Sequence, residues 1–292
     1  MSTLALQTGQ RIRDRLRHDA LGLIALTVVV AYVGIAVGVW LGLWGAEWSA
    51  LSGPGWASPS AEHWLGTNRL GQDILARALA STATAFEIGV LVAVATTVLG
   101  ALAGGLAGYA GPGKVDDTLL WLIGTLEAIP FYLLVAALVF ALGGHPLAMH
   151  LAMIATFWTS TARLVRAETQ RIRELPFIEA ARVAGLAPRA IVLRHVLPNA
   201  AHILLVQGTL VFMAAIKVEV VLSFLGIGVQ DSISWGVMIA EGAQDILAGQ
   251  YWNFAAASLF LFGLVMAANL LADQLQDALD PRSLDSRWQP HG

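Results

Sequence analysis

Cysteine is absent from the 292 residues of this chain, and charged residues make up only 13% of them. Without cysteine, the chain has neither a disulfide framework nor a thiolate metal site. A soluble domain of this length needs far more charge to cover its surface, whereas here 57% of the residues are hydrophobic and the mean hydropathy is +0.68. We therefore expect an all-α membrane protein whose excess apolar residues face a lipid bilayer.

The sequence patterns of an enzyme are lacking as well. No G-x-x-x-x-G-K-[ST] run is present to hold the phosphates of a nucleotide. We find no credible Ser/His/Asp set and no metal-ligand set. The sequence therefore predicts no catalytic residue, no metal site and no cofactor in this chain, and no hydrolysis of ATP by the chain itself.

Long uncharged runs give the number of membrane spans, because a helix needs roughly 20 apolar residues to cross the hydrocarbon core. Six stretches satisfy this requirement: residues 20–46, 88–113, the two halves of 128–162 with the apolar turns before Glu127, 195–216 with its continuation to Gly228, and 246–272. Gly143-Gly144-His145-Pro146 forms the turn between the third and fourth stretches. We therefore predict six transmembrane helices.

The positions of Lys and Arg orient these spans, because cytoplasmic loops carry the excess of positive charge. One side of the predicted membrane holds most of them, namely Arg11, Arg13, Arg15, Arg17, Lys114, the Arg residues from 163 to 194, Arg282 and Arg287. The opposite side holds Arg69 and Arg77, and Lys217 lies within a span. Both termini are therefore expected in the cytoplasm.

This topology divides the chain into five segments. They are a cytoplasmic N-terminal segment (1–19), the first span (20–46), an extracytoplasmic segment (47–84), a transmembrane core (85–272) with a cytoplasmic loop at 166–198, and a cytoplasmic tail (273–292).

The cytoplasmic loop has proline and glycine residues at positions typical of the two ends of a short helix. Pro176 stands just before the first turn and Gly185 near the end, and Pro188 and Pro198 open further helical pieces. We expect the exposed face of this helix to carry Phe177, Ile178, Ala181 and Ala184 or Leu186. A helix with such a face can dock into a groove of another protein. The alternatives are a helix resting on lipid and an ordinary loop.

The amino-acid sequence of this loop resembles that of the membrane subunits of ATP-driven ABC importers. Glu179, Ala180, Ala181, Gly185, Leu197 and Pro198 stand at the motif positions, and His195 and Asn199 fit the dipeptide and oligopeptide branch, which also includes nickel permeases. The resemblance implies that the loop docks onto an ATPase subunit. The coupling residues would be Glu179, Ala180, Ala181, Gly185, Leu186, His195, Leu197 and Pro198.

Other stretches resemble the same branch, nearly continuously from residue 63 to 282. Leu65-Gly66-Thr67-Asn68-Arg69-Leu70-Gly71-Gln72-Asp73 is similar to a hallmark stretch in which the branch commonly has Asp at position 68 and Arg at position 72. Glu219-x-x-Leu222-Ser223-Phe224-Leu225-Gly226, Ser234-Trp235-Gly236 and the ending at residues 277–282 also match.

The resemblance implies a type I ABC importer permease fold in a bacterial cytoplasmic (inner) membrane. The partners would be two ATPase subunits, which hold ATP and Mg, a second homologous permease subunit, and an extracytoplasmic substrate-binding protein. Peptides are the expected solute, with nickel or another small solute as the alternative. Nucleic acid is not expected as a partner, because the basic cluster adjoins a span and lacks interleaved aromatic residues.

Four polar residues within the predicted spans are candidates for the translocation pathway: Glu127, Lys217, Glu219 and Ser223. An ionisable group at this depth is costly and usually faces the protein interior or a water cavity. For Glu127, a structural hydrogen bond beside the break at Pro130 is the alternative. Lys217 is less typical of the branch. An ion-coupled carrier that uses Glu127, Lys217 and Glu219 as a relay is the rival function, and a membrane scaffold without transport is a third.

Three further features carry structural expectations. Gly100, Gly104 and Gly108 recur at every fourth position, which favours close helix packing in a membrane. Asp116 or Asp117 is expected to cap the third span. In the outer stretch 229–250, Asp231, Glu241 and Asp245 form either an acidic surface for the binding protein or ordinary solvated loop charge.

Overall fold

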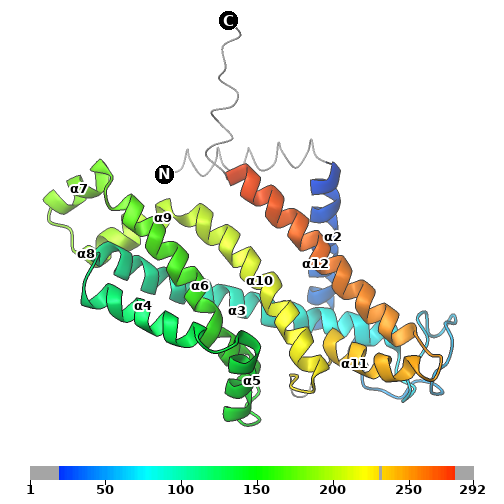
Figure 1. Ribbon diagram of the computed structural model, residues 1–292. Helices are drawn as coiled ribbons and strands as arrows, with labels where there is room; N and C mark the ends of the chain where they lie inside the picture. The colour runs from blue at the N-terminus through cyan, green and yellow to red at the C-terminus, as the bar shows by residue number, and fades with distance from the viewer. Residues whose placement is uncertain (1–19, 230–231, 280–292) are drawn as a thin grey trace, which may run out of the picture. The chain divides into compact units, whose positions relative to one another are not determined.

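The computed structural model describes residues 20–229 and 232–279. Apart from one isolated bridge between Thr67 and Asp73, these residues form helices, turns and loops (Figure 1). The helices are α2 (Ala20–Trp40), α3 (Ile74–Ala110), α4 (Lys114–Glu127), α5 (Phe131–Ala141), α6 (Ala148–Ile172), α7 (Pro176–Val183), α8 (Pro188–Ile191), the π-helix η1 (Val192–Val196), α9 (Leu197–Asn199), α10 (Ala201–Phe224), α11 (Trp235–Ile246) and α12 (Trp252–Leu279).

Among the described residues, four helices are long and apolar enough to cross a membrane, or five if a bent pair counts as one span. The four are α2, α3, α10 and α12, and the pair is α4 with α5, which meet at an angle of 90°. Helix α6 has 25 residues, about 37 Å at 1.5 Å per residue, but it carries several charged side chains in its second half. The regular structure of the described residues is therefore helical, as in a multi-pass membrane protein. Six spans and cytoplasmic termini stay predictions, and residues 1–19 and 280–292 lie outside the described residues.

The helix ends differ from the uncharged runs for local reasons. Helix α2 ends at Trp40, before residue 46, because Gly42 and Gly45 adopt the left-handed conformation with φ of +72°. Helix α3 begins at Ile74, inside the segment expected to be an extracytoplasmic loop. The uncharged run at 88–113 misses the first turns of α3, because these turns contain Arg77 and Glu87.

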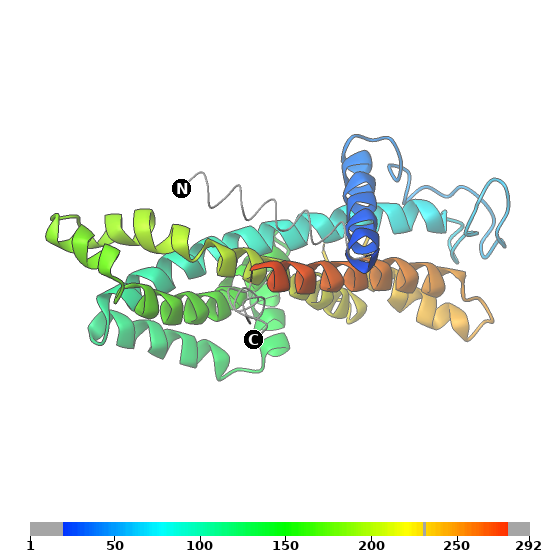
Figure 2. The same ribbon diagram turned by 90° about the horizontal axis from the view of Figure 1, so that it is seen from above.

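The chain forms two compact units, one made of the residues before Ala85 and after Ser232, the other of Ala85–Ser232. In the first unit, α12 packs against both α2 and α11, and α2 crosses α12 (Figure 2). The Tyr32 hydroxyl donates a hydrogen bond of 2.8 Å to the Phe260 carbonyl, and its ring meets those of Phe260 and Trp235 edge to face. Trp235 Nε1 donates to the Ala78 carbonyl over 3.1 Å.

Helix α11 lies where the sequence predicts only an acidic outer stretch, and the expectation of an acidic surface or of solvated loop charge is wrong for Asp245, which is buried. Glu241 accepts a hydrogen bond of 2.7 Å from Arg77, whose side chain is buried, and Asp245 is 5% exposed. The Glu241 side chain remains 38% exposed, so only Asp245 is withdrawn from solvent. Asp231 lies outside the described residues.

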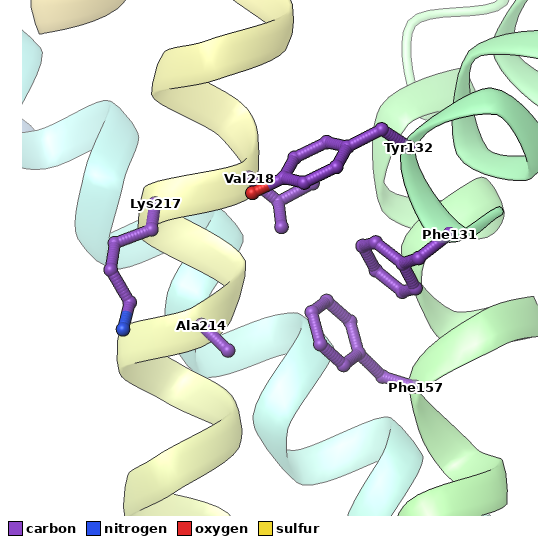
Figure 3. A pocket seen from close by; sticks show the side chains of 6 residues that line it. All are labelled: Phe131, Tyr132, Phe157, Ala214, Lys217 and Val218. Atoms are coloured by element: carbon purple, nitrogen blue, oxygen red, sulfur yellow. The ribbon is translucent and has the colours of Figure 1, made fainter.

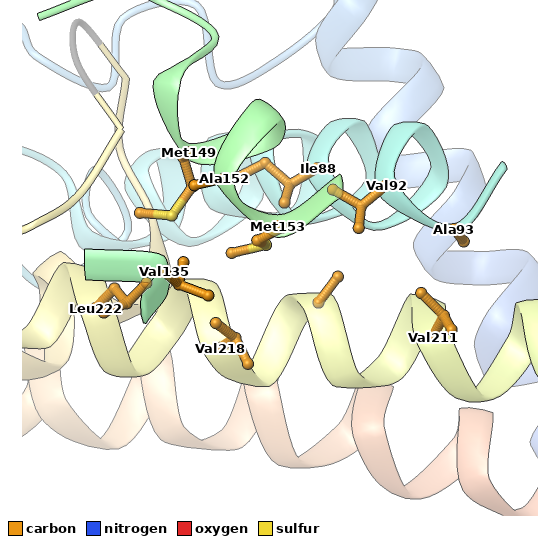
Figure 4. Close-up of a cluster of buried hydrophobic side chains, with 11 residues drawn as sticks. Ile88, Val92, Ala93, Val135, Met149, Ala152, Met153, Val211, Val218 and Leu222 are labelled. Carbon is orange, nitrogen blue, oxygen red and sulfur yellow. The ribbon is translucent and has the colours of Figure 1, made fainter. Parts of the chain in front are cut away.

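The second unit has a core formed by four helices. Its buried side chains come from α3, α5, α6 and α10, and they include Ile88, Val92, Val135, Met153 and Leu222 (Figure 4). A smaller cluster joins α3, α4 and α6 through Ala107, Ile123 and Ala162. Helix α4 runs beside α6 in both views (Figures 1 and 2).

The glycine stripe of α3 lies against α6. A Cβ atom on Gly104 would come within 2.2 Å of the Ala162 carbonyl oxygen, and one on Gly108 within 2.6 Å of the Arg166 carbonyl oxygen. At Gly100 a Cβ atom would lie 2.5 Å from the Thr161 Cβ. The two backbones can approach this closely only because the residues of α3 have no side chain there.

Asp116 does not cap the third span, and neither does Asp117, so this expectation is wrong. The N-cap of α4 is Gly113, with no side-chain cap. Asp116 lies in the first turn, where its carboxylate accepts two hydrogen bonds from Arg166 of α6, one of them over 2.5 Å to Nη2. Its side chain is 4% exposed. The acid therefore joins two helices, because a buried carboxylate requires a cation.

Candidate functional site

The loop between α6 and α10 has a hydrophobic core of its own. Ile172 at the end of α6, Ile178 and Ala181 of α7, Ile191 of α8, and Val196 of η1 are all buried in one cluster. Tyr109, Leu175 and Leu186 pack against this cluster. The loop is thus a small folded element, and α7 is held at its surface by a definite set of contacts.

The expected exposed face of α7 is partly wrong. Ile178 and Ala181 are buried in the loop core, and Leu186 is half-buried against it. The face that does meet solvent carries Phe177, which is 41% exposed, and Val183, which is 85% exposed. Between them lie Glu179, Ala180 and Ala184, which are exposed as well. The inward residues Ile178 and Ala181 are three apart, as one face of a helix requires.

Gly185 ends α7 by its backbone conformation. Its φ is +79°, and no atom lies within 4 Å of the position of a Cβ. The Gly185 N–H donates to the Arg182 carbonyl over 3.0 Å, and the Leu186 N–H donates to the Ala181 carbonyl over 3.2 Å. This is a Schellman motif, in which the apolar residue after the glycine packs back on the helix. Gly185 therefore sets where the exposed face stops.

The residues after α8 form a turn of π-helix. The Leu197 N–H donates to the Val192 carbonyl, five residues earlier, and Pro198 follows without an N–H of its own. Asn199 Nδ2 donates to the His195 carbonyl over 2.5 Å. His195 and Leu197 are half-buried and Pro198 is exposed. These residues thus shape the backbone that carries the loop into α10.

Arg182 connects α7 to α3. Its guanidinium lies over the Tyr109 ring, 5.9 Å from the ring centroid, and a hydrogen bond with the Tyr109 side chain raises the pKa of Arg182 above its ordinary value. A cation over an aromatic face is a stabilising contact. The contact ties α7 to the end of α3, close to Gly111, where that helix stops.

The acid expected in the third span has a partner. Glu127 ends α4 and forms an ion pair with Arg163 of α6, and both side chains are exposed. Nearby on α6, the Ser160 hydroxyl accepts a hydrogen bond of 3.2 Å from Gln207 of α10. Polar groups thus lie on the exposed faces of α4, α6 and α10, although these helices belong to a membrane protein.

Glu219 and Ser223 lie together inside the second unit. Both are buried, and the Ser223 hydroxyl donates to the Glu219 carboxylate. Their spacing of four residues places them on one face of α10.

Lys217 lies on another face of α10, at a pocket of about 330 Å³. The other lining residues are Phe131 and Tyr132 of α5, Phe157 of α6, and Ala214 and Val218 of α10 (Figure 3). Among the four pathway candidates, the structure therefore brings Glu219 and Ser223 together, pairs Glu127 with Arg163, and places Lys217 apart from them beside an aromatic pocket.

Several of these relationships have no signal in the sequence. The pairs Glu127–Arg163 and Asp116–Arg166 join residues 36 and 50 positions apart. The aromatic residues of the pocket belong to apolar runs, from which the sequence predicts membrane spans but no pocket. Only a prediction of which helix faces meet would have found them.

Comparison with known proteins decides the family. Residues 97–285 match the family model described as "Binding-protein-dependent transport system inner membrane component". The chain belongs to this family. Like other members it is a membrane permease, and the matched residues include the loop with α7 and the pocket with Lys217.

Named relatives of this permease align with it over most of its length. It is 40% identical over 232 residues to the "Oligopeptide transport system permease protein OppC" of Mycobacterium tuberculosis (strain ATCC 25618 / H37Rv), covering 78% of this chain and 79% of the relative. It is 33% identical over 270 residues to the "Dipeptide transport system permease protein DppC" of Bacillus subtilis (strain 168), covering 92% and 84%. The permease is therefore OppC/DppC-like.

Proposed function

We propose that this chain is a membrane subunit of an ATP-driven peptide importer in a bacterial cytoplasmic membrane, where it forms half of the translocation pathway. The observation that carries the proposal is its identity of 40% to an oligopeptide permease over 78% of its length. The family description, which names an inner membrane component of binding-protein-dependent transport, supports the location and an extracytoplasmic binding protein as a partner. Di- or oligopeptides are the solute, with nickel or another small solute as the alternative.

The work of transport comes from two ATPase subunits, which bind ATP and Mg, and a second homologous permease subunit completes the pathway. The chain itself is not an enzyme. The six spans of a type I importer permease require α6 to be the fourth span. This fits its length, and its charged second half would then continue into the cytoplasmic loop.

The exposed face of α7 is the coupling surface. Phe177 and Val183 expose apolar side chains on a helix whose other face is already satisfied by the loop core. Fully burying one such side chain contributes about 1.5–3 kcal/mol, which favours docking into a groove of an ATPase subunit. Docking alone does not couple the two proteins, because the contact must differ in free energy between the open and closed ATPase states.

Co-purification and uptake test this function together. We would express the chain with candidate ATPase and permease subunits from the same organism, reconstitute the complex, and measure ATP-dependent uptake of peptides delivered by the binding protein. Val183→Arg is expected to abolish co-purification with the ATPase subunits while the chain still inserts. Leu247→Arg is the control, because Leu247 is 91% exposed but lies in the outer stretch.

Two outcomes would overturn the proposal. Uptake that persists without nucleotide favours the ion-coupled carrier, and a complete, purified complex with no solute-dependent activity favours the scaffold. If Ni²⁺ but no peptide is taken up, the solute is wrong while the architecture stands.

A further inference from the structure

Lys217 interrupts an apolar exposed face of α10. Three apolar residues lie on the same face as Lys217: Leu210 precedes it by seven residues, Val221 follows it by four, and Phe224 follows Val221 by three. Their side chains are 43%, 39% and 46% exposed, respectively. An ammonium in the middle of such a face is costly if the face meets lipid, because hydrocarbon cannot solvate the charge. This face of α10 is therefore better suited to water or to another subunit than to hydrocarbon.

Within the described residues, the Lys217 ammonium has no ion pair and no hydrogen bond. The salt bridges of this unit join Glu127 to Arg163, Asp116 to Arg166, and two neighbouring pairs at the end of α6. Glu219, two residues further along, is buried on a different face and bonded to Ser223. The positive charge is thus available to a ligand.

The pocket beside Lys217 is aromatic and otherwise uncharged. The rings of Phe131 and Phe157 are 4.9 Å apart between centroids, and Phe131 meets Tyr132 edge to face at 5.6 Å. All three rings point toward α10, while the Lys217 side chain leaves the helix at the rim with its ammonium directed away from the rings (Figure 3). The volume of about 330 Å³ is at the lower end for small-ligand pockets.

The N-terminus of α5, which also lines the pocket, is a second source of positive potential. Phe131 and Tyr132 are the first residues of α5, whose N-cap is Pro130 and which has no side-chain cap. The first N–H groups of a helix lack intrahelical partners and carry partial positive charge. This potential has the same sign as Lys217, so the site disfavours a cation and favours an anion attached to an apolar group.

We propose that Lys217, with its flexible side chain turned toward the rings, and the pocket of Phe131, Tyr132 and Phe157 bind the C-terminal residue of the passing peptide, with its carboxylate at Lys217 and its side chain among the rings. The assignment rests on the proposed function, since it concerns the path of the same solute. A free peptide carries an ammonium at its other end, which Lys217 repels, so the carboxyl end enters this site. The site therefore recognises a free carboxylate next to an apolar side chain.

The absence of cysteine from the chain makes this assignment testable by chemical rescue. In Lys217→Cys, the only thiol of the chain stands where the ammonium was. Reaction with 2-aminoethyl methanethiosulfonate restores a primary amine, and reaction with 2-sulfonatoethyl methanethiosulfonate installs an anion. We expect uptake of a free-acid peptide at limiting concentration to fall by about tenfold or more in Lys217→Cys, as for a lost hydrogen bond to a charged group. The amine should restore it and the anion should not.

Val221→Cys is the matched control, because Val221 is one turn away on the same exposed face and has no charge to lose. Its uptake should stay near that of the unmodified complex before and after either reagent. The wild-type complex, treated in the same way, reports any effect on thiols of the partner subunits.

A binding measurement separates recognition of the carboxylate from a structural or lipid-anchoring role. A fluorescent tetrapeptide and its C-terminal amide are titrated against the whole complex in nanodiscs, without the binding protein. The wild type should prefer the free acid, Lys217→Cys should lose the preference, and aminoethylation should restore it. An unchanged preference in Lys217→Cys overturns the proposal, as does equal rescue by both reagents. In either case peptide uptake by the wild type continues, whereas failure of the proposed function removes that uptake itself.

Discussion

Asn68 Nδ2 donates a hydrogen bond to Gln72 Oε1 over 2.8 Å, and both residues are buried. These are the two positions at which the sequence departs from the Asp and Arg that are common in the dipeptide and oligopeptide branch. Asn68 Oδ1 also accepts from the Gln72 N–H over 2.9 Å, and Arg77 donates to Gln72 Oε1. The two departures thus form one neutral pair beside a buried guanidinium.

Gln72→Arg alone is expected to destabilise the first unit. The new guanidinium would lie next to Arg77, which is 2% exposed and has its other partner in Glu241. An uncompensated buried charge costs about 3–5 kcal/mol. Adding Asn68→Asp supplies the missing carboxylate, so the double variant should recover most of the loss. A double-mutant cycle on thermal unfolding of the purified complex measures the coupling, and additive effects would contradict the pairing.

Gly104 is expected to tolerate no side chain. Gly104→Ala places a Cβ 2.2 Å from the Ala162 carbonyl oxygen, so α3 and α6 must separate. Overpacking of this kind costs about 1–3 kcal/mol. Gly124→Ala is the control, because Gly124 lies in α4 with nothing within 4 Å of its Cβ position. Thermal unfolding in detergent should show a clear loss for Gly104→Ala and no loss for Gly124→Ala. Equal stability of both variants would mean that the helices do not approach as described.

The Asp116–Arg166 contact should be among the strongest links between α4 and α6. Asp116→Ala leaves Arg166 without its partner, and removing one member of a buried pair costs about 3–5 kcal/mol. Arg171→Ala breaks the more exposed pair with Glu168, so its cost should stay within about 1 kcal/mol. The measurement is the unfolding midpoint of each variant. A smaller effect for Asp116→Ala than for Arg171→Ala would contradict the ranking by burial.

The sequence predicts elements where local chemistry decides them. Proline and glycine at 176 and 185 mark the start of α7 and the residue just after its end, and the turn at 143–146 separates α5 from α6. It does not predict which apolar residues of α7 face outward. Ile178 and Ala181 are buried in the hydrophobic core of the loop itself. The sequence of an eight-residue helix with apolar groups on both sides does not indicate which side is buried.

The positions of two charged residues of α11 are also not predicted by the local sequence. Glu241 and Asp245 suggested a loop or an open acidic surface, yet they belong to α11. The partner of Glu241 is Arg77, 164 positions away, and no local pattern announces such a pair. Whether a charge is buried depends on its tertiary partner. The aromatic residues beside Lys217 also belong to other helices, so the sequence alone does not predict this pocket.

Gly185 should matter through its conformation. Gly185→Val forces a β-branched residue to adopt φ of +79° and should fray the end of α7, whereas Asn tolerates this conformation. We expect Gly185→Val to reduce peptide-stimulated ATPase activity several-fold and Gly185→Asn to retain most of it. Both variants should insert normally. If Asn is as harmful as Val, the position contacts the ATPase directly and does not act by ending the helix.

If α7 docks onto an ATPase subunit through its exposed face, a thiol on that face should be shielded in the complex, and the labelling rate of Val183→Cys measures this shielding. Val183 is 85% exposed in the chain alone, and the chain has no other thiol to react. The rate of reaction with a membrane-impermeant maleimide is measured for the chain without ATPase subunits and for the complete, active complex. The account predicts rapid labelling of the chain alone and strong protection in the complex. Equal rates in both would contradict it.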